Sequence, residues 1–435
     1  MKRWSHKKIT RLTLPHALAL VMAVGLTVTA FLALPALSLP VQAWNGAVRE
    51  ANLNDPDAFQ YLDAHGRKHT AILDKQAKMR EIDVSKINHH VAYADYVGDE
   101  NYVIRRGIDV SEWTGVINWP LVKAAGYDFA FIRIGYTGGR GGQMPDKLGM
   151  QNVLAAKAAG MDVGVYFFSL AVNEVEAAQE AQFCVNALGG LPLEMPIMYD
   201  AEYILGTPTR NDNVSPAQFT LNAVTFCETV KQFGYEAGVY ANMIFETTLY
   251  DMKFIQNYHV WFADYEPKPQ SPYAYEFWQY NGKGGRIPGI SGDRIDLNLQ
   301  FIITPKGVEN IQKREAFKLS GVTIMDNGEV FDAAYYAGTY PEVIAQIAAM
   351  RKGAVSDPAA AAKYGGAEPM ELYKHYLEYG MNQGKYPSVQ ALQAEAARAK
   401  AAEEIALQQI SKESGISVEE LRKSLERQAG QADKK

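Results

Sequence analysis

The stretch Gly107-Ile108-Asp109-Val110 opens the part of the chain that decides the fold. It is the first of five short apolar segments, at residues 107–110, 129–135, 163–170, 196–202 and 237–241. Amphipathic helical segments lie between them, at residues 119–125, 150–159, 174–188 and 216–233. Strands that alternate with helices in this way form parallel sheets through right-handed crossovers.

Three more strand-like segments follow, at residues 260–264, 277–280 and 295–301, and the loops between them are too short for crossover helices. The pattern therefore predicts an α/β fold. We expect a modified TIM-like barrel of five β/α units plus three strands that lack helices. In such a barrel the chemistry is built at the carboxyl ends of the strands.

The run Met195-Pro196-Ile197-Met198-Tyr199-Asp200-Ala201-Glu202 ends an expected strand with two acids one residue apart. Alternate residues of a strand face the same way, so Asp200 and Glu202 point to one place. Cleavage of a glycosidic bond needs a proton donor and a second carboxylate nearby. Such pairs are also common as solvated acids, but Asp109, Tyr136 and Asp264 fall at strand ends too. Hydrolysis of a sugar polymer is the first hypothesis.

Four motifs occur in a fixed order along the expected barrel: Gly107-Ile108-Asp109-Val110-Ser111-Glu112-Trp113, Asp200-Ala201-Glu202, Phe277-Trp278-Gln279-Tyr280 and Ile295-Asp296-Leu297-Asn298. With these motifs, residues 107–302 resemble glycoside hydrolase family 25, the peptidoglycan-cleaving lysozymes. The resemblance implies an N-acetylmuramidase that hydrolyses the β-1,4 bond between N-acetylmuramic acid and N-acetylglucosamine. It also implies that Glu202 is the general acid and that Asp200, Asp109 and Asp296 surround it.

The chemistry of these acids can be argued independently. A general acid must be protonated at the working pH, and neighbouring carboxylates raise the pKa of one member of a cluster. Glu202 has the longer reach of the adjacent pair, so we expect it to protonate the leaving oxygen. Asp200 would stabilise positive charge or orient the acetamido group of the substrate as an internal nucleophile, and the resemblance favours this second route, with retention. Asp109 and Asp296 act directly or fix a neighbouring side chain. Asp264 is not included.

Substrate contacts are expected from four aromatic residues and one amide, Tyr166, Tyr240, Trp261, Trp278 and Gln279. An aromatic ring can stack on the apolar face of a sugar, although each of these rings fits a packed core equally well. Gln279 is polar within an apolar strand, which a hydrogen bond to sugar or to a catalytic acid would explain. No metal site and no cofactor are expected, because no His/Cys/Asp spacing follows a known ligand pattern.

The first residues carry five basic side chains, and the next charged residue is Arg49. A basic start followed by an apolar stretch is typical of a secretory signal, with cleavage expected before Trp44. The alternative is a membrane anchor, because residues 12–40 could span a bilayer. We therefore expect an extracellular or cell-envelope protein, or an anchored one with its barrel outside.

The remaining boundaries follow from changes of composition. Residues 1–43 are the signal or anchor, 44–104 an extension of unknown role with a helical stretch at 70–80, and 105–304 the barrel. Residues 305–387 form a small α-rich accessory module with a hairpin at 322–331, where Asn327-Gly328 suits a type I′ turn. Residues 388–435 are a charged helical tail broken at Gly415, which is either exposed or bound to a partner.

The whole chain has 435 residues and a formal net charge of −6, which argues against nucleic acid as a partner. Cys184 and Cys227 are its only cysteines, so no disulfide framework is expected; whether they pair or stay as buried thiols is open. Bacterial peptidoglycan is the expected partner. Two alternatives to a muramidase are a non-catalytic protein that binds wall glycan and a glycosidase acting on another N-acetylated polymer such as chitin.

Overall fold

The computed structural model describes residues 55–90, 93–204, 206–282, 286–292, 295–351, 355 and 357–423. The predicted signal or anchor at residues 1–43 lies outside these residues. Within the described part, no helix is both long and apolar enough to cross a membrane.

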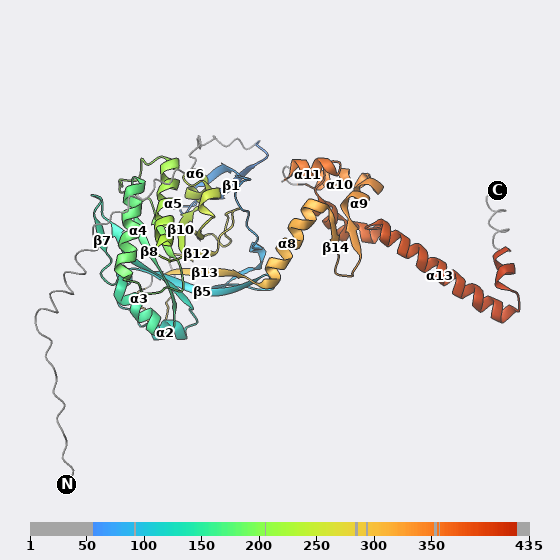
Figure 1. The fold of residues 1–435 in the computed structure, drawn as a ribbon, viewed down its shortest axis with the longest axis horizontal. Helices are drawn as coiled ribbons and strands as arrows, with labels where there is room; N and C mark the ends of the chain where they lie inside the picture. The colour runs from blue at the N-terminus through green and yellow to red at the C-terminus, as the bar shows by residue number, and fades with distance from the viewer. Residues whose placement is uncertain are drawn as a thin grey trace, which may run out of the picture. The chain divides into compact units, whose positions relative to one another are not determined.

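The centre of the fold is a closed barrel of eight strands (Figure 1). The strands are β5 (Tyr102–Val110), β6 (Phe129–Thr137), β8 (Asp162–Ser169), β9 (Ile197–Ala201), β10 (Ala237–Asn242), β11 (His259–Ala263), β12 (Phe277–Asn281) and β13 (Asp296–Ile303). The ring closes because β5 pairs with both β6 and β13. A short strand, β7 (Gln143–Pro145), adds to the end of β6. The predicted barrel is confirmed.

One strand of the ring runs against the other seven. The ring strands from β5 to β12 are parallel to their ring neighbours among themselves, whereas β13 is antiparallel to both β12 and β5. As a result, the first residue of β13 lies beside the last residues of β5, with Asp296 opposite Asp109.

Helices follow the first five strands of the barrel: α2 (Trp119–Ala124), α3 (Gly149–Ala158), α4 (Glu174–Leu188), α5 (Pro216–Gln232), and the short pair α6 (Met243–Thr248) and α7 (Met252–Ile255). Asn173 and Ser215 cap α4 and α5 by accepting a hydrogen bond from a backbone N–H of the first turn. No helix follows β11 or β12 in the described residues. Five strands of the barrel are thus each followed by a helix.

The extension consists of two small hairpins rather than a helix. These are β1 (Ala58–Leu62) with β2 (Lys68–Ile72), and β3 (Ile87–His89) with β4 (Ala94–Tyr96), with the 3-10 turn η1 (Val84–Lys86) before β3. The predicted helix at residues 70–80 is wrong, because a turn with Gly66 at φ 73° folds β2 back onto β1. Beyond β2 the chain is irregular as far as η1.

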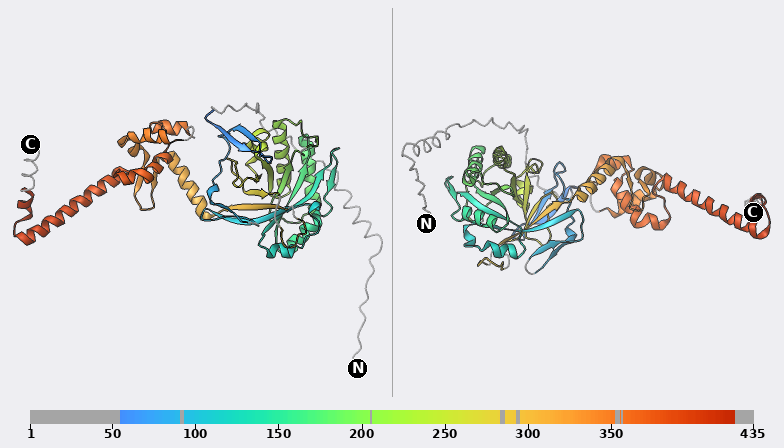
Figure 2. Two further views of the ribbon diagram at one scale, coloured as in Figure 1. Left: turned by 180° about the vertical axis from the view of Figure 1, so that it is seen from behind. Right: turned by 60° about the horizontal axis from the view of Figure 1, so that its bottom comes forward.

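This extension covers the side of the barrel that lacks helices (Figure 2, blue). The backbone of Met79 forms a bridge with Tyr273, and the Ala94 N–H donates to the Tyr280 hydroxyl over 3.1 Å. Tyr61 and Ile87 of the extension belong to the same buried apolar cluster as the outer face of the strands. The extension thus takes the place of the missing helices.

The accessory region begins with a helix that the sequence analysis did not anticipate, α8 (Pro305–Ser320). After it come β14 (Val322–Ile324), β15 (Val330–Asp332), α9 (Ala333–Thr339), α10 (Glu342–Met350), α11 (Pro358–Lys363), α12 (Pro369–His375), the π-turn η3 (Tyr376–Gly380) and the 3-10 turn η4 (Met381–Gln383). Its aromatic residues, among them Phe317, Phe331 and Tyr336, form a core of their own.

Two features of the carboxyl-terminal third match the prediction in part. The hairpin at 322–331 is present, but the Gly328 N–H bonds to the Met325 carbonyl, so Asp326 and Asn327 are the central residues of its turn. The prediction of a type I′ turn centred on Asn327-Gly328 is therefore wrong. Gly328, at φ 82°, comes directly after the two central residues of the turn. The tail helix α13 (Val389–Ser414) ends at Gly415 as predicted.

Candidate active site

Four acids from three strands gather at one end of the barrel. Asp109 lies near the end of β5, and Asp200 and Glu202 lie at the end of β9. Asp296 begins β13, which runs the other way and so delivers its first residue to the same end. Asp109 and Asp200 are buried, whereas Glu202 and Asp296 are half-buried. The structure brings together the whole acid set predicted from the sequence.

Burial and mutual repulsion raise the pKa of every member of this cluster. The pKa of Glu202 rises from 4.5 to about 7, first because the group is desolvated and then because Asp296 is near. Desolvation also raises the pKa of Asp296 to about 6, against a hydrogen bond with Asp109 that lowers it. The pKa values of Asp109 and Asp200 lie well above their ordinary range, because burial is the largest cause in each case and the neighbouring acids add to it. Glu202 therefore keeps its proton at weakly acidic pH and loses it as the pH rises through about 7.

Asp200 is the acid with an unused acceptor. Its Oδ1 atom is buried and has no hydrogen-bond partner among the described residues. The nearby cation Arg133 lowers the pKa of Asp200 and is held by Asp146, whose Oδ2 accepts from Nε over 2.8 Å. A buried acceptor without a donor is costly, so a group brought by the substrate would complete this site.

Asp109 is held by two amide side chains. Its Oδ2 accepts from Gln279 Nε2 over 2.9 Å and from Asn298 Nδ2 over 2.8 Å. The Gln279 Oε1 accepts from Tyr240 and Tyr265, and the Asn298 Oδ1 accepts from Trp261 Nε1 over 2.8 Å. Gln279 was expected to bond either to sugar or to one of the acids, and in the structure it bonds to Asp109.

Two predicted substrate contacts need correction. Trp261 is 1% exposed and sits in the aromatic cluster inside the barrel, so neither face of its ring is open to a sugar. Trp278 is fully buried on the outer face, where it lies edge-on to His89 and donates to the Asp264 carbonyl. Alternation along β12 explains this, because Gln279 points inward and its neighbour must point outward.

The other predicted contacts, Tyr166 and Tyr240, face the acids from inside the barrel. Both are buried, and contact with substrate stays a prediction for them. Asp264, which was not included in the catalytic set, accepts from the backbone N–H groups of Glu266 and Gln270 and so shapes the loop after β11.

Sequence reasoning missed three residues of the site, Arg133, Tyr265 and Asn298. Asn298 gave the same signal as Gln279, a polar side chain inside an apolar strand, and it was already part of a quoted motif. Arg133 likewise interrupts an apolar strand. Tyr265 follows β11 in a loop, where no periodicity reveals its direction.

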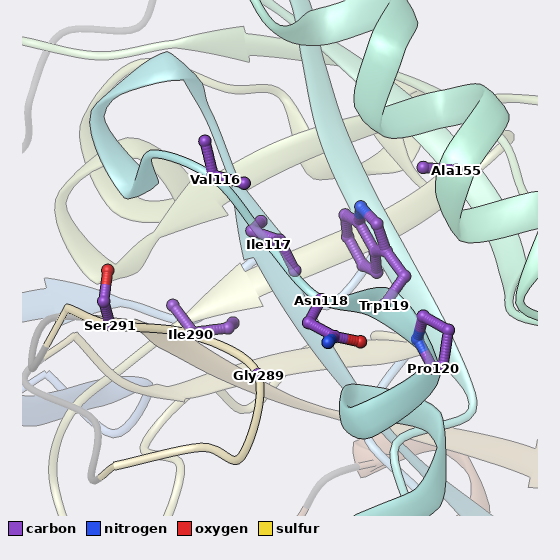
Figure 3. Close-up of a pocket in the computed structure, with 9 residues that line it drawn as sticks. All are labelled: Val116, Ile117, Asn118, Trp119, Pro120, Ala155, Gly289, Ile290 and Ser291. Carbon is purple, nitrogen blue, oxygen red and sulfur yellow. The ribbon is translucent and has the colours of Figure 1, made fainter.

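A hollow of about 590 Å³ lies where the loop after β5 meets the loop before β13 (Figure 3). Val116 and Ile117 lie on one side of it, and Ile290 and Ser291 lie on the other. A backbone bridge between Ile117 and Ile290 joins the loop after β5, the strand that contains Asp109, to the loop before β13, the strand that begins with Asp296. In the 3-10 turn η2 (Glu112–Thr114) of the loop after β5, Trp113 is 82% exposed, so its large aromatic surface is open to solvent.

In the described part of the chain, no group of three or more His, Cys, Asp or Glu side chains is arranged to hold a metal ion. Cys184 and Cys227 are free and buried, which settles their pairing in favour of two thiols.

A closed α/β barrel that gathers four carboxyl groups at its strand ends is an arrangement typical of glycoside hydrolases. Residues 108–290, which make up most of the barrel, match the model of glycosyl hydrolases family 25. The resemblance seen in the four motifs is confirmed.

Lysozyme M1 of Streptomyces globisporus is 28% identical over 209 residues, which cover 44% of this chain and 66% of that protein. The chain therefore spans just under two thirds of the length of this curated relative. Among solved structures, the bacterial lysozyme from Streptomyces coelicolor is 25% identical with a TM-score of 0.38. The match covers 45% of this chain and 90% of the lysozyme chain. A family 25 glycosyl hydrolase from Bacillus anthracis is 21% identical with a TM-score of 0.41, covering 51% and 98%.

Proposed function

We propose that this protein is a lysozyme that hydrolyses the β-1,4 bond between N-acetylmuramic acid and N-acetylglucosamine in peptidoglycan. The single observation that carries the proposal is Glu202, with a pKa of about 7, beside three acids at the mouth of a family 25 domain. The name of the relative Lysozyme M1 agrees with this substrate.

In this mechanism Glu202 gives its proton to the glycosidic oxygen as the bond to the anomeric carbon breaks. Its raised pKa keeps the proton available up to neutral pH, and ionisation above about 7 removes the acid. After the leaving sugar departs, the Glu202 carboxylate can take a proton from the attacking water, which restores the acid for the next cycle.

Asp200 would hold the acetamido group of the sugar on the other side of the bond. Its unpartnered Oδ1 can accept the acetamido N–H, which turns the acetamido oxygen toward the anomeric carbon. That oxygen then forms a bond to the carbon while the glycosidic bond breaks, and water later displaces it with overall retention.

Replacing Glu202 with Gln tests the assignment, with release of reducing sugar from purified peptidoglycan as the measurement. We expect a loss of at least about a hundredfold, in the range of general acid catalysis, with the exposed Glu174→Gln as the matched control. Undiminished release by the Glu202 variant would refute the proposed role.

The alternatives give different outcomes. A protein that only binds wall glycan would sediment with peptidoglycan and release no sugar as wild type. A glycosidase for another N-acetylated polymer would cut chitin rather than peptidoglycan, which mass spectrometry of the products would reveal.

We also propose export, with the barrel acting outside the cell or in its envelope, on the basis of the basic and then apolar first 43 residues. The amino-terminal sequence of the exported protein would distinguish cleavage before Trp44 from a retained anchor. A partner for the tail helix α13 is a further expectation, and cross-linking in intact cells would identify it.

A further inference from the structure

The loop between β11 and β12, residues 264–276, brings the side chain of Tyr265 to the acid cluster. The Tyr265 hydroxyl donates to Gln279 Oε1 over 2.8 Å, and the amide nitrogen of Gln279 donates in turn to Asp109 Oδ2 over 2.9 Å. Desolvation, and after it the charges of Asp296 and two neighbouring acids, raise the pKa of Tyr265. The residue as a whole is nevertheless 47% exposed. Its ring therefore has the hydroxyl end at the acids and another part open to solvent.

This loop has no regular structure that would fix the place of Tyr265. All of its residues are described, and none belongs to a helix or a strand. The Asp264 carboxylate accepts from the backbone N–H groups of Glu266 and Gln270, over 3.1 and 2.8 Å. These two bonds close a turn that contains Tyr265. The turn is attached to β12 at Asp264, whose carbonyl accepts from an indole, and needs a second attachment at Gln270.

The second attachment comes from the extension. Gln270 Oε1 accepts from the Leu62 N–H over 2.7 Å, and Gln270 Nε2 donates to the Leu62 carbonyl over 2.9 Å. The side-chain amide thus pairs with the last residue of β1 as a neighbouring strand would, and these backbone groups fix the way the amide faces. Its Nε2 also lies 3.2 Å from Asp264 Oδ2. One side chain therefore joins the extension to both ends of the turn.

Two further side chains of the extension hold the same loop. Arg80 Nη1 donates to the Pro269 carbonyl over 2.9 Å and also to the Ser271 carbonyl. His89 Nε2 lies 2.6 Å from the Pro267 carbonyl, which can only accept, so the ring nitrogen is the donor. The loop is thus bound to the extension at several successive carbonyl groups.

We propose that the extension acts as a clamp on this loop, with Gln270 as the positioning residue that holds Tyr265 against the acid cluster. The extension lies outside residues 108–290, the part that matches family 25, so the matched part alone does not contain the clamp. The consequence for hydrolysis rests on the proposed function. The open part of the Tyr265 ring forms one side of the place where the glycan meets Glu202, and a loose loop would let the glycan bind out of line with the acid.

The first test follows the position of Tyr265 without any enzyme assay. The full chain is labelled with carbon-13 at the tyrosine ring carbon that bears the hydroxyl, and Tyr265→Phe identifies the signal. Gln270→Leu keeps the approximate size of the side chain and removes its hydrogen bonds to Leu62. In this variant we expect the Tyr265 signal to move toward the value of a tyrosine in water. An unchanged signal would overturn the proposal.

Gln256→Leu is the matched control. Gln256 Oε1 accepts from the Lys78 N–H over 2.6 Å and its Nε2 donates to the Lys78 carbonyl over 2.8 Å, so it attaches the extension to the barrel by the same kind of pairing. Its contact with the loop, to the Ala274 carbonyl over 3.3 Å, is at the opposite end from Tyr265. We expect only Gln270→Leu to move the Tyr265 signal. Equal movement in both variants would refute a specific role of Gln270.

The second test is a double-mutant cycle in kcat/KM on soluble peptidoglycan fragments. We expect Gln270→Leu to lower kcat/KM about tenfold, which is the scale of one lost hydrogen bond. In a Tyr265→Ala background the same substitution should have no further effect, because no ring is left to position. Equal losses in the two backgrounds would show that Gln270 does not act through Tyr265.

His89→Phe covers the case in which Gln270→Leu does not fold, because His89 is exposed and a phenyl ring keeps the edge-on contact with Trp278. This variant removes only the bond to the Pro267 carbonyl, and we expect a smaller movement of the Tyr265 signal in the same direction. A signal at its wild-type value would contradict the clamp. Absence of any hydrolysis by the wild type would refute the proposed function, whereas the tyrosine signal would still decide whether the extension positions Tyr265.

Discussion

Glu246 on α6 links the stability of the barrel to pH. Its side chain is 3% exposed, and neither carboxyl oxygen has a hydrogen-bond partner among the described residues. Desolvation raises the pKa of Glu246 from 4.5 to about 8; the neighbouring Ser271 lowers it, and the charge of Asp264 adds to the rise. Between these two pH values the folded protein keeps a proton that the unfolded chain has lost.

The sign and size of the effect follow from this difference. Below about pH 4.5 both states are protonated, so the stability is fully present, and it is lost as the pH rises toward about 8. One extra proton on the folded state changes the free energy of unfolding by about 1.4 kcal/mol per pH unit. From pH 5 to pH 7 Glu246 alone would therefore cost the barrel about 3 kcal/mol.

Glu246→Gln keeps the shape of the side chain and abolishes the titration. Urea unfolding of the wild type and the variant at several pH values would measure the difference in slope. Tryptophan fluorescence suits the purpose, because Trp113, Trp119, Trp261 and Trp278 all lie in the barrel and no tryptophan follows residue 278. We expect the free energy of unfolding of the variant to increase relative to that of the wild type as the pH rises. The same dependence of this free energy on pH in both proteins would refute the reasoning.

Three further outcomes are expected. In Asp296→Asn, the fall of kcat/KM at alkaline pH moves to lower pH by about one unit at most, because burial is the larger cause of the raised pKa of Glu202. A fall at the same pH as in the wild type would contradict repulsion between Asp296 and Glu202. Trp113→Ala is expected to raise the KM for polymeric glycan roughly fivefold, because the exposed ring can stack on a sugar of the glycan chain, and to leave the KM for a short oligosaccharide unchanged. Tyr280→Phe leaves the Ala94 N–H without its acceptor, and chemical denaturation should show a loss of about 1–3 kcal/mol.

The barrel was predictable because its strands and helices follow their periodicities closely. The segments at 129–135 and 174–188 recur almost unchanged as β6 and α4, since buried apolar runs and capped amphipathic helices are local signals. The extension was not predictable in the same way. Its β1 and β2 are short, and they gain their stability from contact with the barrel rather than from their own pattern.

For the site, the acids were found because strand ends are marked in the sequence, but their partners were not. Strand parity alone would have turned Trp278 outward once Gln279 was placed inward beside Asp109. The burial of Trp261 could not be predicted in this way. The alternation of side chains places Trp261 inside the barrel, but it does not show that Asn298 and the surrounding aromatic rings enclose it. The direction of β13 was open as well, since only the closed ring reveals which neighbour it meets.

The reversed strand β13 has a consequence for the timing of activity. Asn298 and Asp109, which it joins by a hydrogen bond, are separated by 189 residues. Asp296 and Asn298 reach Asp109 only when the last strand closes the ring, so a chain that is still being synthesised holds an incomplete set of acids. For the lysozyme that we propose, hydrolysis would therefore begin only after the barrel has folded completely.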